Sequence, residues 1–166
     1  MRITAQMIMR GLLLTGRPSE AVRKNQLAAM HEAVQYTARR VKQRVPQGVM
    51  GAQGGLLGSI QPEVCQRLRG VTGIVGTPLS YGLVVEKGRT PGKGRPPAGV
   101  LLRWIEVKMG VSAEEAKAIE YPVRWKIAKK GTKGAFMFEK TLEEDWPAIQ
   151  TIFDRYGVKI SRELAQ

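Results

Sequence analysis

From residue 18 onward, apolar and small residues recur at alternating steps of three and four, which is the period of an amphipathic helix. The residues that carry this pattern are Leu27, Met30, Val34, Ala38, Val41 and Val45. Pro18 suits the first turn of a helix, and Pro46 ends one because proline has no backbone N–H to continue the hydrogen bonding. The pattern therefore predicts one helix of about 25 residues.

The opposite face of this predicted helix is basic. It carries Arg23, Lys24, Arg39, Arg40, Lys42 and Arg44. The simpler interpretation, which we favour, is a face that is only solvated. The alternative is a stripe that binds nucleic acid.

The hydrophobic period changes to two after Ser59. Ile60, Val64 and Leu68 alternate with polar residues, and the run VTGIVG follows them. Two strands that join at Arg69-Gly70 fit this pattern best. Residues 2–9 form either a short strand or part of an N-terminal arm over residues 1–16, because neither period is clear there.

Glycine and proline mark the segments between these elements. Residues 47–58 hold five glycines, so we expect a flexible loop over residues 46–58. The stretch SYGLVVEKG reads as a short helical or turn segment that ends at Gly88. A second flexible loop is expected over residues 88–95, where Gly, Pro, Lys and Arg gather.

Two more helices are predicted after this loop. Pro96 and Pro97 start the first, and Gly110 ends it. Its apolar face holds Val100, Leu101, Trp104 and Ile105. Ser112 and Glu115 form a capping box that starts the second helix, because side chain and backbone satisfy each other's free donors. Pro122 interrupts or restarts that helix.

The C-terminal segment, residues 139–166, is predicted to be helical with a break at Gly157. Its apolar positions are Leu142, Trp146, Ile149, Ile152, Phe153 and Tyr156. The order helix, strands, helices predicts an α+β fold, in which the long N-terminal helix packs on a small, mostly antiparallel β-sheet. A length of 166 residues is that of one domain, so we expect a single domain over residues 1–166.

The net charge of the chain indicates which classes of partner it favours. The chain has 27 Lys and Arg against 14 Asp and Glu, a net charge of +13, which favours nucleic acid, an anionic membrane surface or an acidic protein. Residues 122–138 contain no acid and five bases, namely Arg124, Lys126, Lys129, Lys130 and Lys133. Together with Arg89, Lys93 and Arg95 of the second loop, they form the expected anion-facing surface.

The chain has few residues that could serve in catalysis or hold a metal ion. His31 and Cys65 are the only histidine and the only cysteine, so we expect no internal disulfide, no thiolate zinc site and no metal or cofactor, and an enzyme built on either residue is the least favoured hypothesis. The run from Gly88 to Gly94 is one residue too short for a P-loop, has glycine where Ser or Thr holds magnesium, and contains Pro91. No apolar run has the length of a membrane span, and Arg10 and Gly11 split the N-terminal apolar stretch, which argues against a signal peptide.

Three segments, taken in order, resemble the small head-tail joining and tail-completion proteins of long-tailed bacteriophages. PQGVMGAQGGLLGSI at 46–60 is similar to that family's proline followed by its "TG-x-L-x-x-S-I" element, although Gly54-Gly55 replaces Thr-Gly. Residues 80–110 resemble its signature of a Tyr, Val-Glu-x-Gly, a loop, Pro-Pro and a helix with Leu and Trp. Residues 127–138 resemble its "I-x-x-x-G-T-x-x-x-x-F" segment. The motif positions in these last two segments are Tyr81, Glu86, Gly88, Pro97, Trp104, Gly131 and Thr132.

This resemblance implies a structural virion protein and not an enzyme. Proteins of this family form a ring, commonly of six subunits, at the tail end that meets the head connector, and DNA passes through the ring. The implied partners are further copies of the chain, a tail tube or tail terminator protein, a head connector or stopper protein, and DNA, with no membrane. The implied location is the neck of the virion, after assembly in the host cytoplasm. In that family setting, Glu86 and Gly88 fix a turn and Trp104 anchors its helix in the core.

The charge bears on what the basic loop contacts in such a ring. A compact subunit is about 40 Å across, and that length of duplex carries roughly 24 phosphates. Six copies, each with a net charge of +13, carry far more positive charge than this duplex can neutralise. We therefore expect a protein neighbour at least as much as DNA at the basic surface. The alternative function is that of a non-specific nucleic-acid-binding domain.

Overall fold

The computed structural model describes residues 2–7, 20–46, 55–67 and 70–165. By their contacts, the residues group into two compact units. Unit 1 comprises Met1–Arg44, Ser59–Pro78 and Met137–Gln166, and unit 2 comprises Val45–Gly58 and Leu79–Phe136. That residues 1–166 fold as a single domain stays a prediction. The α+β class is confirmed, and so is the long N-terminal helix on a small antiparallel sheet.

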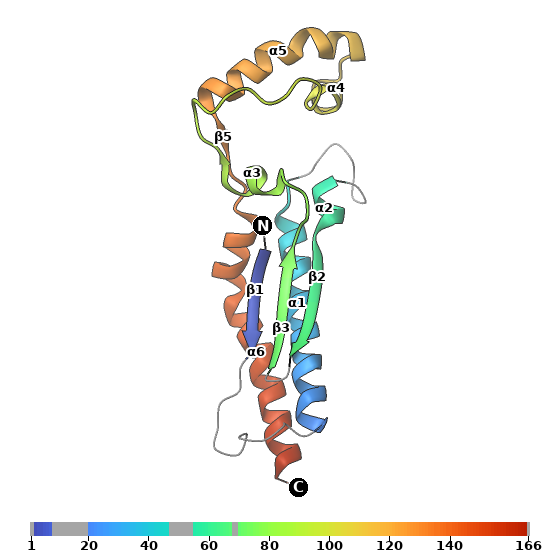
Figure 1. Ribbon diagram of the computed structural model, residues 1–166, viewed down its shortest axis with the longest axis vertical. Coiled ribbons are helices and arrows are strands. Elements are labelled where there is room, and N and C mark those ends of the chain that lie inside the picture. Colours follow the sequence, from blue (N-terminus) through green and yellow to red (C-terminus); the bar gives the residue numbers. More distant parts are fainter. Residues whose placement is uncertain (1, 8–19, 47–54, 68–69, 166) are drawn as a thin grey trace. The chain divides into compact units, whose positions relative to one another are not determined.

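Unit 1 contains a three-stranded antiparallel sheet of order β1-β3-β2 (Figure 1). Its strands are β1 (Arg2–Met7), β2 (Gln61–Arg67) and β3 (Gly70–Gly76). In register, Arg2 and Gln61 both lie opposite Gly76 of the central strand. The two strands predicted after Ser59 are therefore confirmed, while their connection at residues 68–69 lies outside the described residues. Of the two alternatives for residues 2–9, the strand is the one observed over Arg2–Met7.

Helix α1 (Glu20–Arg44) packs against β2, β3 and the C-terminal helix α6 (Met137–Leu164). Its length is the predicted one, and the predicted positions Met30, Val34, Ala38 and Val41 are buried. Leu27 and Val45 are only half-buried. Alanines widen the buried stripe, which lets the helix lie close to the sheet and to α6. The additional small or apolar members are Val22, Ala29 and Ala33.

Helices α1 and α6 run antiparallel along one face of the sheet (Figure 1). Asn25 near the start of α1 donates a hydrogen bond to Glu163 at the end of α6, and Arg44 at the end of α1 reaches Asp145 near the start of α6. Between these ends, Ala33 packs with Ile149 and Ile152. Half-buried aromatic rings of both helices surround this apolar cluster, namely Tyr36, Phe153 and Tyr156.

Asp145 is a buried carboxylate between α1 and α6. It accepts hydrogen bonds from Tyr36 (3.3 Å), Arg40 (2.7 Å) and Arg44 (2.6 Å), which occupy successive turns of one face of α1. Burial alone would raise the pKa of Asp145, but the hydrogen bonds and charges of Arg40 and Arg44 outweigh it and leave that pKa below its usual value. We call Tyr36, Arg40, Arg44 and Asp145 the Asp145 cluster. Two of the six basic residues predicted on the solvated face of α1 thus serve the contact with α6.

The C-terminal helix differs from its prediction in two respects. It starts at Met137 and continues to Leu164 without a break at Gly157, so the predicted break is wrong. A glycine inside a helix costs only about 1 kcal/mol relative to alanine, and burial of Ile152 and Ile160 on either side outweighs that cost. Pro147 also lies inside the helix. The carbonyl that lacks a donor there belongs to Glu143, which is exposed, so water can satisfy it.

The face of α6 that the sequence predicts as apolar is only partly buried. Ile149 and Ile152 are buried, whereas Leu142 and Trp146 are 38% and 45% exposed. The corresponding core positions belong to Thr141 and Asp145. These polar side chains are tolerated inside because each has partners: the Thr141 hydroxyl donates to the Met137 carbonyl at 2.7 Å.

Unit 2 is built from short elements and two packed helices. Its elements are α3 (Gly82–Lys87), β4 (Gly88–Arg89), α4 (Leu102–Met109), α5 (Ala113–Lys130) and β5 (Thr132–Lys133). The predicted end of α3 at Gly88 and the capping box of Ser112 and Glu115 are confirmed. A further short helix, α2 (Gly55–Ser59), occupies the end of the segment predicted as a flexible loop. That prediction is wrong for residues 55–58, and residues 47–54 lie outside the described residues.

Helices α4 and α5 pack on each other, with Ile105 and Ala116 fully buried. Helix α4 starts at Leu102 instead of at Pro96, because residues 96–99 hydrogen-bond to α5 in a non-helical conformation. The Arg124 side chain donates to the Pro96 carbonyl, and Glu120 accepts from the Gly99 N–H, both at 2.7 Å. Gly110 ends α4 as predicted.

Helix α5 is continuous through Pro122, so the predicted interruption is wrong. Proline at this position removes the N–H that would bond to the Ala118 carbonyl. Ala118 and Pro122 are both exposed, so that carbonyl remains accessible to water. The anchors of Glu120 and Arg124 to residues 96–99 lie on either side of Pro122 and support the helix on both sides of it. Among the described residues, no helix is both long and apolar enough to cross a membrane.

We expect Asp145→Asn to destabilise the protein by about 2 kcal/mol or more at neutral pH, because two arginines lose the charge that compensates them. A depressed pKa in the folded state means that the carboxylate contributes stability above its unfolded pKa, about 3.9, and loses it as the pH falls through the folded value. Urea unfolding at several pH values should therefore show the parent and variant converging in acid.

Glu144→Gln is the matched control. Glu144 also pairs with Arg44, at 2.6 Å, but its side chain is 60% exposed, so its loss should cost less than about 1 kcal/mol. Equal losses for the two variants, or a pH-independent loss for Asp145→Asn, would contradict the proposed role of the Asp145 cluster.

Candidate interaction site

Two motif segments that are distant in sequence meet in unit 2. Strand β4 pairs antiparallel with β5, so that Gly88 lies opposite Lys133 and Arg89 opposite Thr132. Beyond the strands, the Ala135 and Phe136 N–H groups donate to the Val85 and Glu86 carbonyls at 2.8 and 3.0 Å. Residues 85–89 and 132–136 therefore form one continuous backbone contact.

Glycine is required on both sides of this contact. Gly88 and Gly131 have φ values of +75° and +68°, in the left-handed region that other residues adopt at a cost. A Cβ atom at Gly88 would collide with the Thr132 carbonyl oxygen, and one at Gly131 would collide with the Arg89 carbonyl oxygen. A backbone carbonyl of each motif segment therefore leaves space only for glycine at the facing position of the other segment.

The loop over residues 88–95 is held at several points. The Arg89 guanidinium donates to the carbonyls of Lys93 and Gly94 at 2.6 to 3.0 Å, and the Gly92 N–H donates to the Ala128 carbonyl at 2.8 Å. The loop is thus closed on itself and tied to the last turns of α5, which differs from the flexible loop predicted. Arg89 is half-buried, and its donors bind the loop's own carbonyls.

Arg95 lies over two aromatic rings of α5. Its guanidinium carbon is 5.4 Å from the ring centre of Tyr121 and 5.8 Å from that of Trp125. Trp125 donates a hydrogen bond to the Tyr121 hydroxyl at 3.2 Å. That hydrogen bond, followed by the charge of Arg95, holds the pKa of Tyr121 below its ordinary value. Despite these contacts, Tyr121 and Trp125 are 56% and 50% exposed.

Five of the basic residues singled out in the sequence lie on the segments that the loop and α5 bring together. The loop supplies Lys93 and Arg95, the end of α5 supplies Lys129 and Lys130, and β5 supplies Lys133, and all five are exposed. The contact of Gly92 with Ala128 and the pairing of β4 with β5 bring the two basic segments together. The two segments therefore meet as the sequence predicts, although Arg89 is engaged inside the loop.

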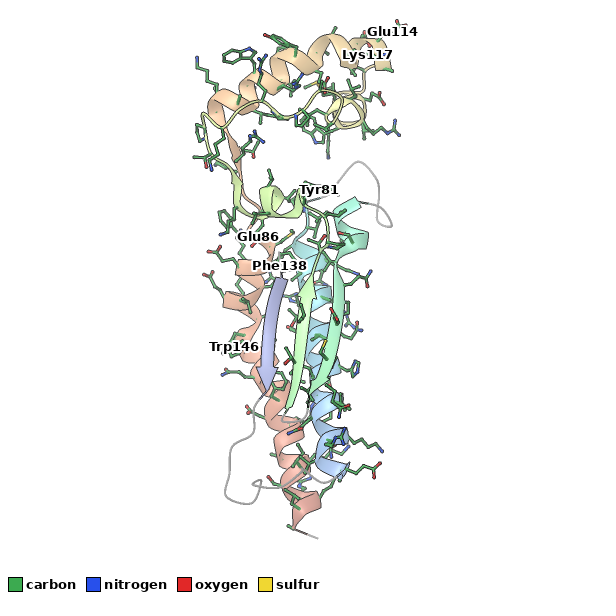
Figure 2. The ribbon with its side chains drawn as sticks, viewed as in Figure 1. Tyr81, Glu86, Glu114, Lys117, Phe138 and Trp146 are labelled. Atoms are coloured by element: carbon green, nitrogen blue, oxygen red, sulfur yellow. The ribbon has the colours of Figure 1, made fainter. Side chains whose placement is uncertain are left out.

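Other motif residues have structural positions. Glu86 is fully buried at the end of α3, while Tyr81 precedes α3 and is 45% exposed (Figure 2). Pro97 and Thr132 are exposed. The expectation that Trp104 anchors its helix in the core is wrong, because Trp104 is 41% exposed and Ile105 is the residue buried against α5. Adjacent helical positions point about 100° apart, so only one of the two faces α5.

Sequence reasoning missed the aromatic part of this surface. Tyr121 and Trp125 lie one helical turn apart, with Lys117 and Lys129 one turn beyond on each side. This spacing of four was visible in the sequence, but an interruption at Pro122 would have separated the two rings. The continuity of α5 is what aligns them.

The two candidate catalytic residues, His31 and Cys65, belong to unit 1, whereas this surface belongs to unit 2. His31 is exposed on α1, and the Cys65 thiol on β2 contacts the Glu63 carboxylate at 3.5 Å. In the part of the chain that the structure describes, no three or more His, Cys, Asp or Glu side chains are placed to hold a metal ion. Comparison with protein-family models, curated proteins and solved structures finds no match to this chain.

We expect Gly131→Ala to destabilise unit 2 by about 3 kcal/mol or more, because left-handed strain of roughly 1–2 kcal/mol adds to the collision with the Arg89 carbonyl. Hydrogen exchange of the amides in residues 85–89 and 132–136 measures the effect directly. Gly92→Ala is the matched control, since Gly92 also has a positive φ but an added methyl there meets open space. Equal protection losses in the two variants would refute the close approach of β4 and β5.

Proposed function

We propose that this protein is a structural virion protein of a tailed bacteriophage or prophage. It forms a ring at the head-proximal end of the tail and joins the tail to the head connector, with DNA passing through the ring. Its partners are further copies of itself, six being the expected number, a tail tube or tail terminator protein, and a head connector or stopper protein. We assign it no catalytic activity and no cofactor, and place it in the neck of the virion after assembly in the host cytoplasm.

One observation carries this proposal: two of the motif segments that resemble the tail-completion family form a single backbone contact. Gly88 belongs to the segment 80–110 and Gly131 to the segment 127–138, and each glycine is required by a carbonyl of the other segment. The motifs are weak when taken singly. Their joint structural role supports the view that these two segments constitute one signature and not two coincidences.

The surface of unit 2 also supports a role in assembly. Several large apolar side chains on and beside α4 and α5 are 41% to 60% exposed, namely Val100, Trp104, Val107, Met109, Tyr121 and Trp125. Exposed apolar side chains that adjoin one another commonly mark surfaces that a neighbouring protein covers, and Tyr121 and Trp125 adjoin each other on α5.

We expect deletion of the gene from the phage or prophage to leave separate heads and tails. Electron microscopy of lysates and a titre of infectious particles measure this outcome. Supplying the intact chain in trans should restore joined, infectious particles, and Lys140→Glu, which changes an exposed lysine, should restore them equally well. Normal infectious particles after deletion would refute the proposal.

A non-specific nucleic-acid-binding domain is the second candidate, because Arg95, Tyr121 and Trp125 combine cationic and stackable groups on an exposed surface. This candidate requires micromolar or tighter binding to a DNA duplex, with log affinity falling steeply against log salt concentration. Fluorescence anisotropy of a labelled duplex between about 50 and 200 mM salt measures it. Undetectable or salt-insensitive binding would eliminate this candidate.

A further inference from the structure

Helix α5 presents a ridge in which two aromatic residues lie between two lysines. Lys117, Tyr121, Trp125 and Lys129 follow one another at steps of four residues, so they line one side of the helix. All four are exposed, and Lys117 lies towards the start of α5 (Figure 2). We call these four residues the α5 ridge. Arg95 lies over both of its rings and adds a third positive charge.

Helix α6 presents a surface of the opposite charge in unit 1. Leu142, Trp146 and Gln150 are exposed and lie at steps of four, with the exposed Glu139 and Glu143 beside them on the same side of the helix. Trp146 points outward from α6 (Figure 2). We call these five residues the α6 stripe. Residues 137–150 contain four acids and one base, Lys140. Glu144 and Asp145 pair with Arg40 and Arg44 of α1, so Glu139 and Glu143 supply the negative charge of the α6 stripe.

We propose that the α5 ridge of one chain docks on the α6 stripe of a second copy. This proposal rests on the proposed function, in which copies of the chain associate, and it names the surfaces that join them. Each surface has two large apolar side chains one helical turn apart. The charges beside them are mainly positive on the α5 ridge, where Glu114 is the exposed acid next to Lys117, and mainly negative on the α6 stripe, where Lys140 is the exposed base next to Glu139. The two signs are opposite. The contact therefore buries the exposed rings and also pairs charges of opposite sign.

The contact has the geometry of ordinary helix packing. Ridges formed by residues four apart pack into the grooves between such ridges on a second helix. The Leu142 and Trp146 side chains then meet Tyr121 and Trp125, and aromatic pairs of this kind contribute beyond the area they bury. Lys117 and Lys129 flank this centre, so one of them faces the carboxylates of Glu139 and Glu143 and the other lies towards Gln150.

A protein helix suits the α5 ridge better than a DNA duplex does. The phosphate backbone of a duplex offers partners for the lysines but none for the apolar faces of Tyr121 and Trp125, which are about half exposed. The α6 stripe offers both kinds of partner, and each chain carries one ridge and one stripe. Every copy therefore brings a matching acidic surface for each basic one.

The two surfaces differ, so the contact is head-to-tail. Such a heterologous contact leaves one free ridge and one free stripe on any open chain of copies, and it ends only when a ring closes. A single contact of two helix ridges is small, which predicts weak, concentration-dependent association in solution. Its charges also predict that association weakens as salt rises.

Charge-reversal pairs test the contact. Lys117→Glu with Lys129→Glu gives a chain with two acidic surfaces, and Glu143→Lys with Gln150→Lys gives a chain with two basic surfaces. Sedimentation velocity of the purified full chain at low salt should show that each variant alone self-associates at least about tenfold more weakly than the parent. An equimolar mixture of the two variants should associate at least as strongly as the parent, because every ridge again meets a stripe of opposite charge.

Lys108→Glu with Lys140→Glu is the matched control, since it changes the net charge as much as the first variant does and alters two exposed lysines outside both surfaces. It should associate like the parent. A parent that stays monomeric up to hundreds of micromolar, or a mixture no more associated than its parts, would overturn the proposal. Loss of duplex binding in Lys117→Glu with Lys129→Glu, with self-association unchanged, would overturn it too and assign the ridge to nucleic acid.

These outcomes are separate from those of the gene deletion. Self-association of the purified chain judges the contact between copies, and the joining of heads to tails judges the role in the virion. Restored association in the variant mixture together with normal particles after deletion would support the interface and refute the proposed function. The reverse pair of results would keep the function and reject this interface.

Discussion

The pairing of Asp145 with Arg40 and Arg44 is the contact on which unit 1 depends. It joins α1 to α6, which are separated by about a hundred residues, and it lies at the end of α1 where the chain leaves for unit 2. A carboxylate so little exposed is stable only if cations and a hydroxyl surround it, and Tyr36 completes that set. The sheet lies against α1, and α1 is held to α6 by this cluster together with the apolar packing around Ala33.

Much of the fold follows from local patterns. The limits of α1, the two strands after Ser59, the end of α3 at Gly88 and the capping box at Ser112 follow from hydrophobic period and from glycine, proline and cap residues. Where tertiary contacts compete with those rules, the contacts prevail. Pro122 and Gly157 do not break their helices, because anchors or buried side chains on both sides hold each helix together. The cost of either residue, a few kcal/mol at most, is smaller than what packing supplies.

The exposure of large side chains is what the sequence predicts worst. Trp104, Leu142 and Trp146 fit apolar periods and are nonetheless exposed, while Asp145 breaks the period of α6 and is buried. A hydrophobic period identifies the apolar face of a helix but not the element that covers this face. In α4, Ile105 is the residue that is buried, against α5. The basic segments at 88–95 and 122–138 were found from composition. That these segments meet at β4 and β5 could be seen only from the backbone pairing. That Tyr121 and Trp125 line one side of α5 could be seen only once α5 was found to be continuous.

The interleaving of the two units in the chain has a consequence for biosynthesis. Unit 1 draws on the first residues and on the last helix, whereas most of unit 2 is one segment, Leu79–Phe136. During synthesis, residues 79–136 leave the ribosome before α6 is translated. Unit 2 can therefore complete its contacts first, while the face of α1 that α6 will cover is still exposed. Unit 1 closes only after α6 has been translated, so a product that stops before α6 leaves the face of α1 that α6 covers exposed to water.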